Sequence, residues 1–303
     1  MTKKLHPYIF AGLDFMVDKD NNIVFLEANS NPGLMMVYKK LYGNFGPVDK
    51  FVAALKNEKQ VIFLYSHEYV ESESYGYTFG AFRTALGKRC RQIVLTKKQM
   101  KEFSLPLKDI QGNIITSGTI WNSRLNVKRA FSKNKNFRII NTADVCDITI
   151  DKFKTHQAVC RLKGVKILKT FAFSTKEEAL RLIEKNNLKT FVIKPRKGTG
   201  GKNVFILNSP KELEKKKLPE GQWILQEKVE VSKQWNKFWD IRVFVVNGKY
   251  AGAVKRVSKN PVVNVSLGGA TAKVDIALQK RLAPLAEKCV AAISAYSQKK
   301  TAR

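Results

Sequence analysis

The first apolar positions of the chain form two short runs separated by a polar segment. The first run covers residues 11–17, and the second, Ile-Val-Phe-Leu, begins at Ile23. Residues 18–22 between them are rich in Asp and Asn, which favour turns. Two such runs joined by a turn predict a β-hairpin. The second run ends in Glu-Ala-Asn-Ser before Asn-Pro-Gly breaks the strand.

This hairpin carries three oxygen-bearing side chains. Glu27 and Asn29 are two positions apart, so a regular strand projects both to the same face. Asp14 lies on the preceding strand and would lie beside them. A few oxygen ligands on a rigid sheet suit Mg²⁺, which also keeps waters and phosphate oxygens. The alternative is a hairpin whose polar residues are simply solvated at its open end.

The segment from residue 59 to residue 150 has the pattern of a separate α/β unit. It follows an amphipathic helix predicted over residues 48–56. Apolar runs that predict strands alternate there with stretches that predict helices, and this alternation favours a small, mainly parallel sheet. The predicted strands cover residues 61–65, 92–95, 114–121 and 137–141.

The pattern changes again after residue 150. Asp151 is a candidate N-cap of a helix, and Ser174 with Glu177 would form the capping box of a second helix. A strand then ends in Lys194, a basic glycine loop follows, and the chain returns as a strand near Val204. Glycines let a loop turn its N–H groups toward a phosphate, and the lysine adds a fixed positive charge. The segment therefore predicts a phosphate-binding loop, although it is not a Walker A loop.

The C-terminal part predicts a second hairpin and a long helix. The hairpin turns at Asn247-Gly248, which is a strong short-range turn signal. Asp240, Arg242 and Arg256 lie near its open end, where charged residues are most often solvated. An apolar-striped helix is predicted over residues 275–296.

Composition and charge narrow the class of protein. The 303 residues are 44% hydrophobic, as in a globular protein, and no apolar run is long enough for a membrane span. No secretory signal is evident, and the four cysteines are widely spaced, so we expect a cytoplasmic protein with reduced thiols. The 55 Lys and Arg against 25 Asp and Glu give a formal charge of +30, which favours polyanionic partners. The lysines are dispersed, so a dedicated nucleic-acid interface is not favoured.

With these motifs in view, the chain resembles the ATP-grasp superfamily. Within it, the chain is similar to the RimK-like and glutathione-synthetase-like carboxylate–amine ligases. The Asp151-Lys152 segment, the Asn122-Ser123-Arg124 element and the Lys194-Pro195 loop are also similar to the YheC/YheD group. The resemblance implies an α/β (α+β) ATP-grasp fold with a pre-ATP-grasp α/β domain.

The motifs occur in a rotated order relative to that family. The implied domains are a metal-binding part (1–58), a pre-ATP-grasp domain (59–150), an ATP-grasp subdomain with the phosphate loop (151–225) and a second subdomain (226–303). In the family, the metal-binding hairpin comes last. Two explanations are open: a circular permutation, which we favour, or a chain cut from a tandem array of such domains.

The resemblance also implies roles for individual residues. Lys152 and Lys194 would hold the α- and β-phosphates, and the loop of Gly198, Thr199, Gly200 and Gly201 would close over them. The hinge of Glu227, Lys228 and Val229 would read adenine. Asp240 would contact the ribose or nucleotide, and Asn264 would lie near the triphosphate. Arg256 matches the arginine that stabilises the acyl phosphate, and Asp14, Glu27 and Asn29 match the magnesium ligands.

One position departs from the family pattern. RimK-like ligases carry an arginine two residues before the asparagine, where this chain has Val262, and this puts the substrates in doubt more than ATP binding. The implied activity is ligation of a carboxylate to an amine, such as an amino acid or acidic peptide, with ATP and Mg²⁺, or Mn²⁺ instead. The alternative is a non-catalytic nucleotide- or nucleic-acid-binding protein on the same scaffold.

Overall fold

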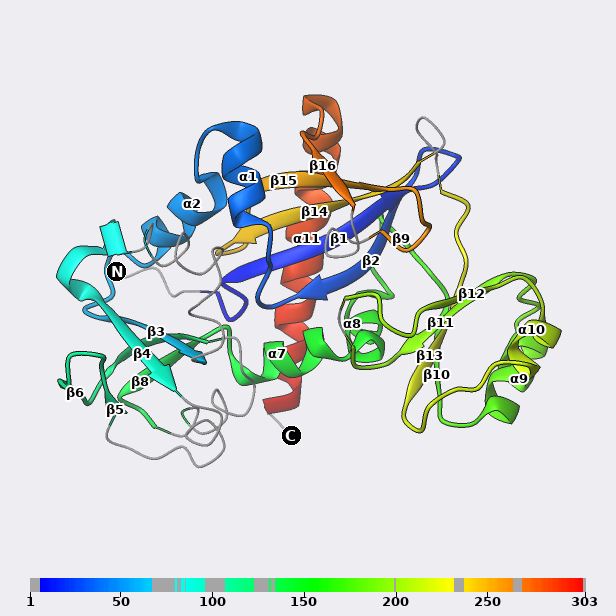
Figure 1. Ribbon diagram of the computed structural model, residues 1–303, viewed down its shortest axis with the longest axis horizontal. Coiled ribbons are helices and arrows are strands. Elements are labelled where there is room, and N and C mark those ends of the chain that lie inside the picture. Colours follow the sequence, from blue (N-terminus) through cyan, green and yellow to red (C-terminus); the bar gives the residue numbers. More distant parts are fainter. Residues whose placement is uncertain are drawn as a thin grey trace.

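The computed structural model shows three large sheets side by side, with one long helix behind the central sheet (Figure 1), and a fourth sheet of only two strands. It describes residues 6–66, 80, 83–84, 86–95, 107–122, 131, 134–198, 200–231, 237–263 and 269–301. Among these residues, no helix combines the length and apolarity needed to cross a membrane.

The central sheet joins the two ends of the described chain. Its six strands lie in the order β16 (Ala270–Ala272), β15 (Lys249–Ser258), β14 (Phe238–Val246), β1 (Phe10–Val17), β2 (Ile23–Asn29) and β9 (Lys166–Ile167). The predicted N-terminal hairpin is confirmed as β1 and β2, and it pairs with the hairpin of β14 and β15. Asn247 and Gly248 both have positive φ at the turn of that second hairpin, as the Asn-Gly signal requires.

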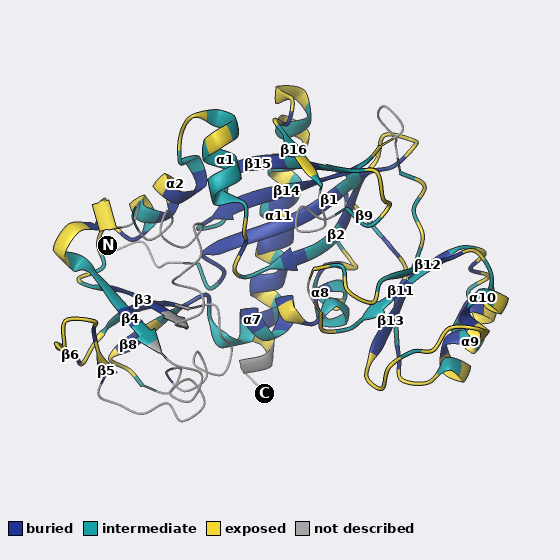
Figure 2. Ribbon diagram, viewed as in Figure 1, coloured by how far each residue is buried: buried dark blue, intermediate teal, exposed yellow. Residues whose placement is uncertain are grey.

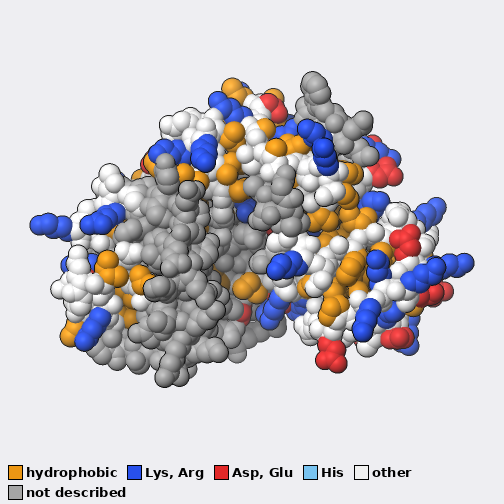
Figure 3. All heavy atoms as spheres, viewed as in Figure 1, with side chains coloured by type: hydrophobic (Ala, Val, Ile, Leu, Met, Phe, Trp, Pro, Cys, Tyr) orange, Lys and Arg blue, Asp and Glu red, His pale blue; other side chains and the backbone are white. Residues whose placement is uncertain are grey.

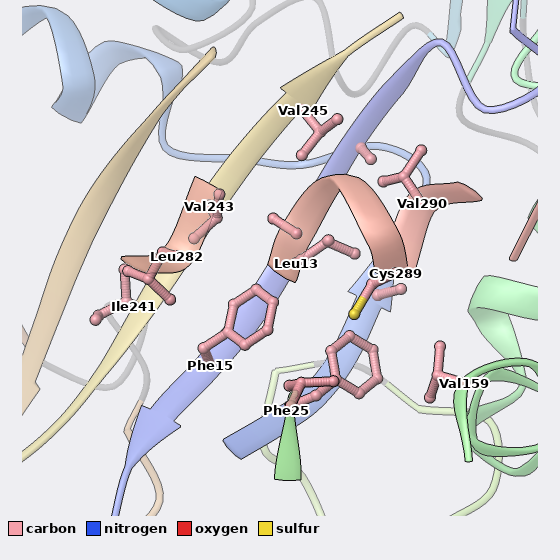
Figure 4. Packing of buried hydrophobic residues seen from close by; sticks show 14 of the residues in the cluster. Leu13, Phe15, Phe25, Val159, Ile241, Val243, Val245, Leu282, Cys289 and Val290 are labelled. Atoms are coloured by element: carbon pink, nitrogen blue, oxygen red, sulfur yellow. The ribbon is translucent and has the colours of Figure 1, made fainter. Parts of the chain in front are cut away.

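One face of the central sheet is covered by α11 (Ile276–Thr301), α7 (Ala143–Ile150) and α8 (Lys152–Val159). Alternate residues of β1, such as Leu13 and Phe15, pack there against Leu282 and Cys289 of α11 (Figure 4). Since successive residues of a strand face opposite sides, Asp14 lies on the other face. The main apolar core thus fixes which side of the sheet is left for polar residues.

The opposite face packs against α1 (Met35–Tyr42) and α2 (Gly46–Ala54) and contacts the second sheet. Phe10 of β1 stacks on Phe51 of α2, with ring centroids 4.8 Å apart. The Asn141 side chain accepts from the Phe10 N–H and donates to the carbonyls of Phe10 and Ser30. This buried amide ties the α/β sheet to the end of the N-terminal hairpin.

The second sheet is parallel, as the sequence predicts, in the order β4 (Cys90–Leu95), β3 (Val61–Ser66), β7 (Gly118–Asn122) and β8 (Phe137–Ile140). The 3₁₀ turn η1 (Gly87–Arg89) precedes β4. The prediction of one strand over residues 114–121 is wrong. Its first part, β6 (Ile114–Ile115), pairs with β5 (Leu107–Lys108), and Gly118, with a φ of 143°, starts a new strand. One of the stretches for which the sequence predicts a helix, residues 76–86, falls largely outside the described residues.

The third sheet is antiparallel, in the order β10 (Thr170–Phe173), β13 (Trp223–Glu227), β11 (Phe191–Pro195) and β12 (Phe205–Leu207). Helices α9 (Lys176–Lys185) and α10 (Pro210–Glu214) cover its outer face and are exposed away from the sheet (Figure 2). The capping box of α9 is one residue later than predicted. Thr175 and Glu178 form it, while the Ser174 N–H only donates to Glu178.

Candidate functional site

Four charged side chains lie together on the central sheet, on the face opposite α11. The strand register places Asp14 directly beside Arg242, and Asp240 directly beside Arg256. Arg242 donates to both oxygens of Asp14 at 2.8 and 2.7 Å, and Arg256 donates to both oxygens of Asp240 at 2.5 and 2.7 Å. Arg256 Nη2 also lies 3.0 Å from Asp14 Oδ2, so the two pairs form one network.

This network is buried, so the pKa of each carboxyl group depends on the charges of its neighbours. The side chains of Asp14 and Asp240 are only 2% and 5% exposed. Burial opposes ionisation of Asp14, but the two arginines outweigh it and hold its pKa well below its usual range. Burial raises the pKa of Asp240 to about 7, against the opposing effect of Arg256. Against the effect of burial, both carboxylates raise the pKa of Arg256.

Glu27 faces the same side because of a β-bulge. Phe15 pairs with Phe25, but Asp14 pairs with Glu27, so Leu26 is the extra residue. Phe25 packs into the core under α11, whereas Glu27 lies directly opposite Asp14. Asn29 pairs with Gly12 further along the same face. The three predicted metal-ligand residues are thus brought to one end of one hairpin.

The two predicted phosphate-binding lysines come from different elements, a helix and a strand, and both interact with Glu27. Lys152 starts α8, and its Nζ lies 3.9 Å from Glu27 Oε2 and donates to the Gly198 carbonyl at 2.6 Å. Lys194 lies on β11 of the third sheet. Burial lowers the pKa of Lys194 to about 8, with the charge of Lys152 acting in the same direction and Glu27 and Asp14 opposing. Glu27 therefore opposes the shift of Lys194 and lies 3.9 Å from Lys152.

Glu27 and Asn29 add oxygen atoms on the same face as Asp14, whose carboxylate already binds two arginines. The Asn29 side chain would bind a cation through its amide oxygen, because its amide nitrogen, which is buried without a hydrogen-bond partner among the described residues, is a donor. Three arginine contacts occupy Asp14, and since a carboxylate offers about four lone pairs, Oδ1 retains one. Glu27 is 32% exposed. Within the described part of the chain, no cluster of three His, Cys, Asp or Glu residues forms a ready metal site. Glu27 and Asn29, with the remaining lone pair of Asp14, therefore fit a hard cation that keeps other ligands.

The predicted adenine hinge lies at the end of β13. The Glu227 N–H donates to the Lys169 carbonyl, and the Lys228 N–H donates to the Thr190 carbonyl. The chain continues to Val231, which bridges to Asp18 at the turn of the N-terminal hairpin. Glu227, Lys228 and Val229 therefore lie where the third sheet connects to the central sheet.

The glycine loop follows β11, as predicted. Gly200 and Gly201 have φ angles of 73° and 71°, which side chains rarely adopt, so the loop needs glycine at both positions. Gly198 is the residue whose carbonyl accepts from Lys152. Thr199 and Asn264, like Ser123 and Arg124, lie outside the described residues.

Two residues of this region were not singled out from the sequence. Arg242 was taken as one of several charges at a strand end, although it lies two residues from Asp240 and so shares its face. Arg196 was part of the basic loop, and it binds the buried carboxylate of Asp151 at 2.8 and 2.9 Å. The predicted N-cap is confirmed, since Asp151 accepts from the N–H groups of Phe153 and Lys154.

Comparison with known proteins agrees with this architecture. Residues 149–297 match the model of the RimK-like ATP-grasp domain. The chain is 33% identical over 156 residues to the coenzyme gamma-F420-2:alpha-L-glutamate ligase of Methanocaldococcus jannaschii, covering 50% of this chain and 52% of that protein. It is 28% identical over 162 residues to the protein of the same name from Methanococcus maripaludis, covering 52% and 55%. The chain thus spans about half the length of the curated relatives that it matches.

Solved structures show the same fold at low identity. A protein from Methylobacillus flagellatus KT, provisionally named a gamma-glutamylcysteine synthetase, superposes with a TM-score of 0.66 and 13% identity, over 98% of this chain and 90% of that chain. The VanG D-Ala:D-Ser ligase of Enterococcus faecalis superposes with a TM-score of 0.50 and 13% identity, over 78% and 83%. The expected ATP-grasp fold is confirmed. Circular permutation and the tandem array both stay predictions.

Proposed function

We propose that this chain, which contains a RimK-like ATP-grasp domain over residues 149–297, is an ATP-dependent carboxylate–amine ligase. In the proposed reaction, an oxygen of the substrate carboxylate attacks the γ-phosphorus of ATP, which gives an acyl phosphate and ADP. The nitrogen of an amine then attacks the acyl carbon. An amide forms, inorganic phosphate leaves, and the amine loses a proton. The chemistry requires charge neutralisation around the transferring phosphoryl group.

One observation carries this proposal: Lys152 at the start of α8 and Lys194 on β11 both interact with Glu27, beside a buried pair of arginines. A phosphate chain bound there would meet fixed positive charges in a partly dehydrated site, where such charges act most strongly. We propose that Lys152 and Lys194 bind the phosphates. The glycine loop with Gly198, Thr199, Gly200 and Gly201 would cover them, and Asn264 would lie near the triphosphate.

The resident cation would be held by Glu27 and Asn29, with Asp14 contributing its remaining lone pair. Bound Mg²⁺, or Mn²⁺ instead, would supply positive charge to the phosphate oxygens. The hinge of Glu227, Lys228 and Val229 would contact adenine.

Arg256 is proposed to stabilise the acyl phosphate. Its Nε and Nη2 bind Asp240, whereas Nη1 donates to no acceptor among the described residues and is available to a substrate oxygen. Asp240 was expected to contact the ribose or nucleotide. Because both of its oxygens accept from Arg256, we propose that it orients that guanidinium as well. A dedicated general base is not required if the amine is well positioned.

The choice of substrates to test rests on the names of the relatives and on the charge of the chain. Both curated relatives are named as ligases that act on coenzyme gamma-F420-2 and alpha-L-glutamate. An amino acid such as glutamate is therefore the first amine to test, and an acidic peptide is the second because the chain carries a formal charge of +30. On the described part of the face shown in Figure 3, Lys and Arg side chains are spread out and do not gather into one patch.

The test is ADP release from ATP and Mg²⁺, with a library of amino acids and peptides as paired carboxylate and amine. We expect ADP only when both substrates are present, together with a product that mass spectrometry identifies as an amide. Glu27→Gln should lower the rate by about 100-fold or more while the circular dichroism spectrum is unchanged. Glu230→Gln, which alters an exposed carboxylate paired with Lys19, is the matched control and should keep full activity. Full ADP production by Glu27→Gln would show that the metal assignment is wrong.

A further inference from the structure

Asp151 connects three structural features with one carboxylate. Its Oδ1 accepts from the N–H groups of Phe153 and Lys154 and so caps α8. Both of its oxygens also accept from Arg196 Nε, at 2.8 and 2.9 Å. Arg196 in turn donates to the Gln222 side chain at 3.2 Å, and its guanidinium lies 5.5 Å from the Phe153 ring. The Asp151 side chain is 2% exposed, so this is a buried ion pair.

The pair joins two separately packed parts of the molecule. Val159 of α8 lies in the core beneath the central sheet. Arg196 follows β11, whose Phe191 and Ile193 lie in the core of the third sheet. The backbone adds to the connection, because Lys152 N–H donates to the Arg196 carbonyl at 3.0 Å and Asp151 bridges to Lys197. In Figure 1, α8 lies between the central sheet and β11.

Each partner is close in sequence to one proposed phosphate-binding lysine. Lys152 directly follows Asp151, and Lys194 precedes Arg196 by two residues. Lys152 begins α8, which packs beneath the central sheet, and Lys194 lies on β11 of the third sheet. A rotation of one part against the other would change the separation of the two ammonium groups unless something held the parts together.

We infer that Asp151 and Arg196 are positioning residues that clamp the central and third sheets and set the separation of Lys152 and Lys194. The inference rests on the proposed function in that the two lysines bind the phosphates of ATP. A fixed separation matches one length of phosphate chain. The clamp thereby favours nucleotides with at least two phosphates over adenosine or a monophosphate, because only the longer chains reach both lysines.

The charge of Asp151 matters to the clamp and not to the helix cap. Asparagine caps helices about as well as aspartate, so Asp151→Asn keeps the cap and removes only the charge that holds Arg196. Arg196→Met keeps the length of the side chain and removes the other charge. If the pair acts as one unit, the double variant should be no worse than either single variant.

Isothermal titration of adenosine, AMP and ADP tests the clamp without turnover. We expect Asp151→Asn and Arg196→Met each to weaken ADP binding by about 10-fold and adenosine binding by less than about 2-fold. The double variant should match the single ones. Asp18→Asn is the matched control, because Asp18 is also 2% exposed and also combines backbone N–H groups with a cation, Lys166. It should leave the ADP to adenosine ratio unchanged.

A second measurement needs no nucleotide. Spin labels on the exposed Cys160, at the end of α8, and on a cysteine introduced by Lys185→Cys on α9 report the distance between the two parts. We expect the distance distribution to broaden in Asp151→Asn and Arg196→Met but not in Asp18→Asn. An unchanged distribution in both clamp variants overturns the inference, as does an unchanged ADP to adenosine ratio. Wild-type protein that does not bind ADP would instead overturn the proposed function, and the distance distribution would still decide the clamp.

Discussion

Lys194→Met should stabilise the ligand-free protein at neutral pH while removing a phosphate-binding group. Lys194 is held in the folded state with a pKa of about 8, chiefly by burial, compared with 10.5 in an exposed lysine. The folded state thus disfavours the charged form, and a difference of this size corresponds to roughly 3 kcal/mol. Methionine is similar in length and carries no charge. We expect the free energy of unfolding to rise by about 1–3 kcal/mol at pH 7.

The pH dependence identifies the cause. Below pH 8, Lys194 is charged in both the folded and the unfolded state, so the full cost is present. Between pH 8 and 10.5 it is neutral when folded but still charged when unfolded, and the cost disappears as the pH rises through this window. At pH 10 the advantage of the methionine variant should fall below about 1 kcal/mol.

Urea unfolding at pH 7 and pH 10, followed by far-ultraviolet circular dichroism, measures both values. Lys189→Met is the control, because Lys189 is exposed just before the same strand and should change little at either pH. Lys194→Met should also lose most of its affinity for ADP. A loss of more than 1 kcal/mol at pH 7, or a gain of equal size at both pH values, would refute the reasoning.

Three further predictions concern the same region. Arg242→Met leaves the buried Asp14 with fewer donors and should lower the free energy of unfolding in urea by about 3 kcal/mol. Adding Asp14→Asn to this variant should restore most of that loss. A loss below about 1 kcal/mol would contradict the burial argument. Gly12→Ala would place a Cβ 2.5 Å from Pro32 Cβ and should cost about 1–3 kcal/mol by thermal unfolding, whereas Gly33→Ala, with open space around it, should have little effect. Binding of ADP at pH 8.5 should be accompanied by proton uptake, because a nearby phosphate favours the charged form of Lys194. Titration calorimetry in buffers of different ionisation enthalpy measures this uptake. An absence of uptake would show that Lys194 does not contact the phosphates.

The local elements could be predicted from the sequence, because each depends on residues close together in the chain. The N-terminal hairpin, the Asn247-Gly248 turn, the Asp151 cap and the strand–loop–strand around Lys194 all form as their local signals indicate. The capping box of α9 was misplaced by one residue because Ser174 and Thr175 are both good caps with a glutamate three residues later.

The tertiary structure decided how the site is assembled. Regular alternation from Phe25 would have put Glu27 into the core, and only the bulge at Leu26 turns it toward Asp14. The register of β1 against β14 pairs Asp14 with Arg242, across 228 positions of sequence, and turns an apparent surface charge into a buried ion pair. Local patterns cannot contain such pairings, since they arise from the packing of the sheet against α11 and from the register that this packing imposes. The sequence thus determined which side chains have the right chemistry, and the folded sheet determined which of them meet.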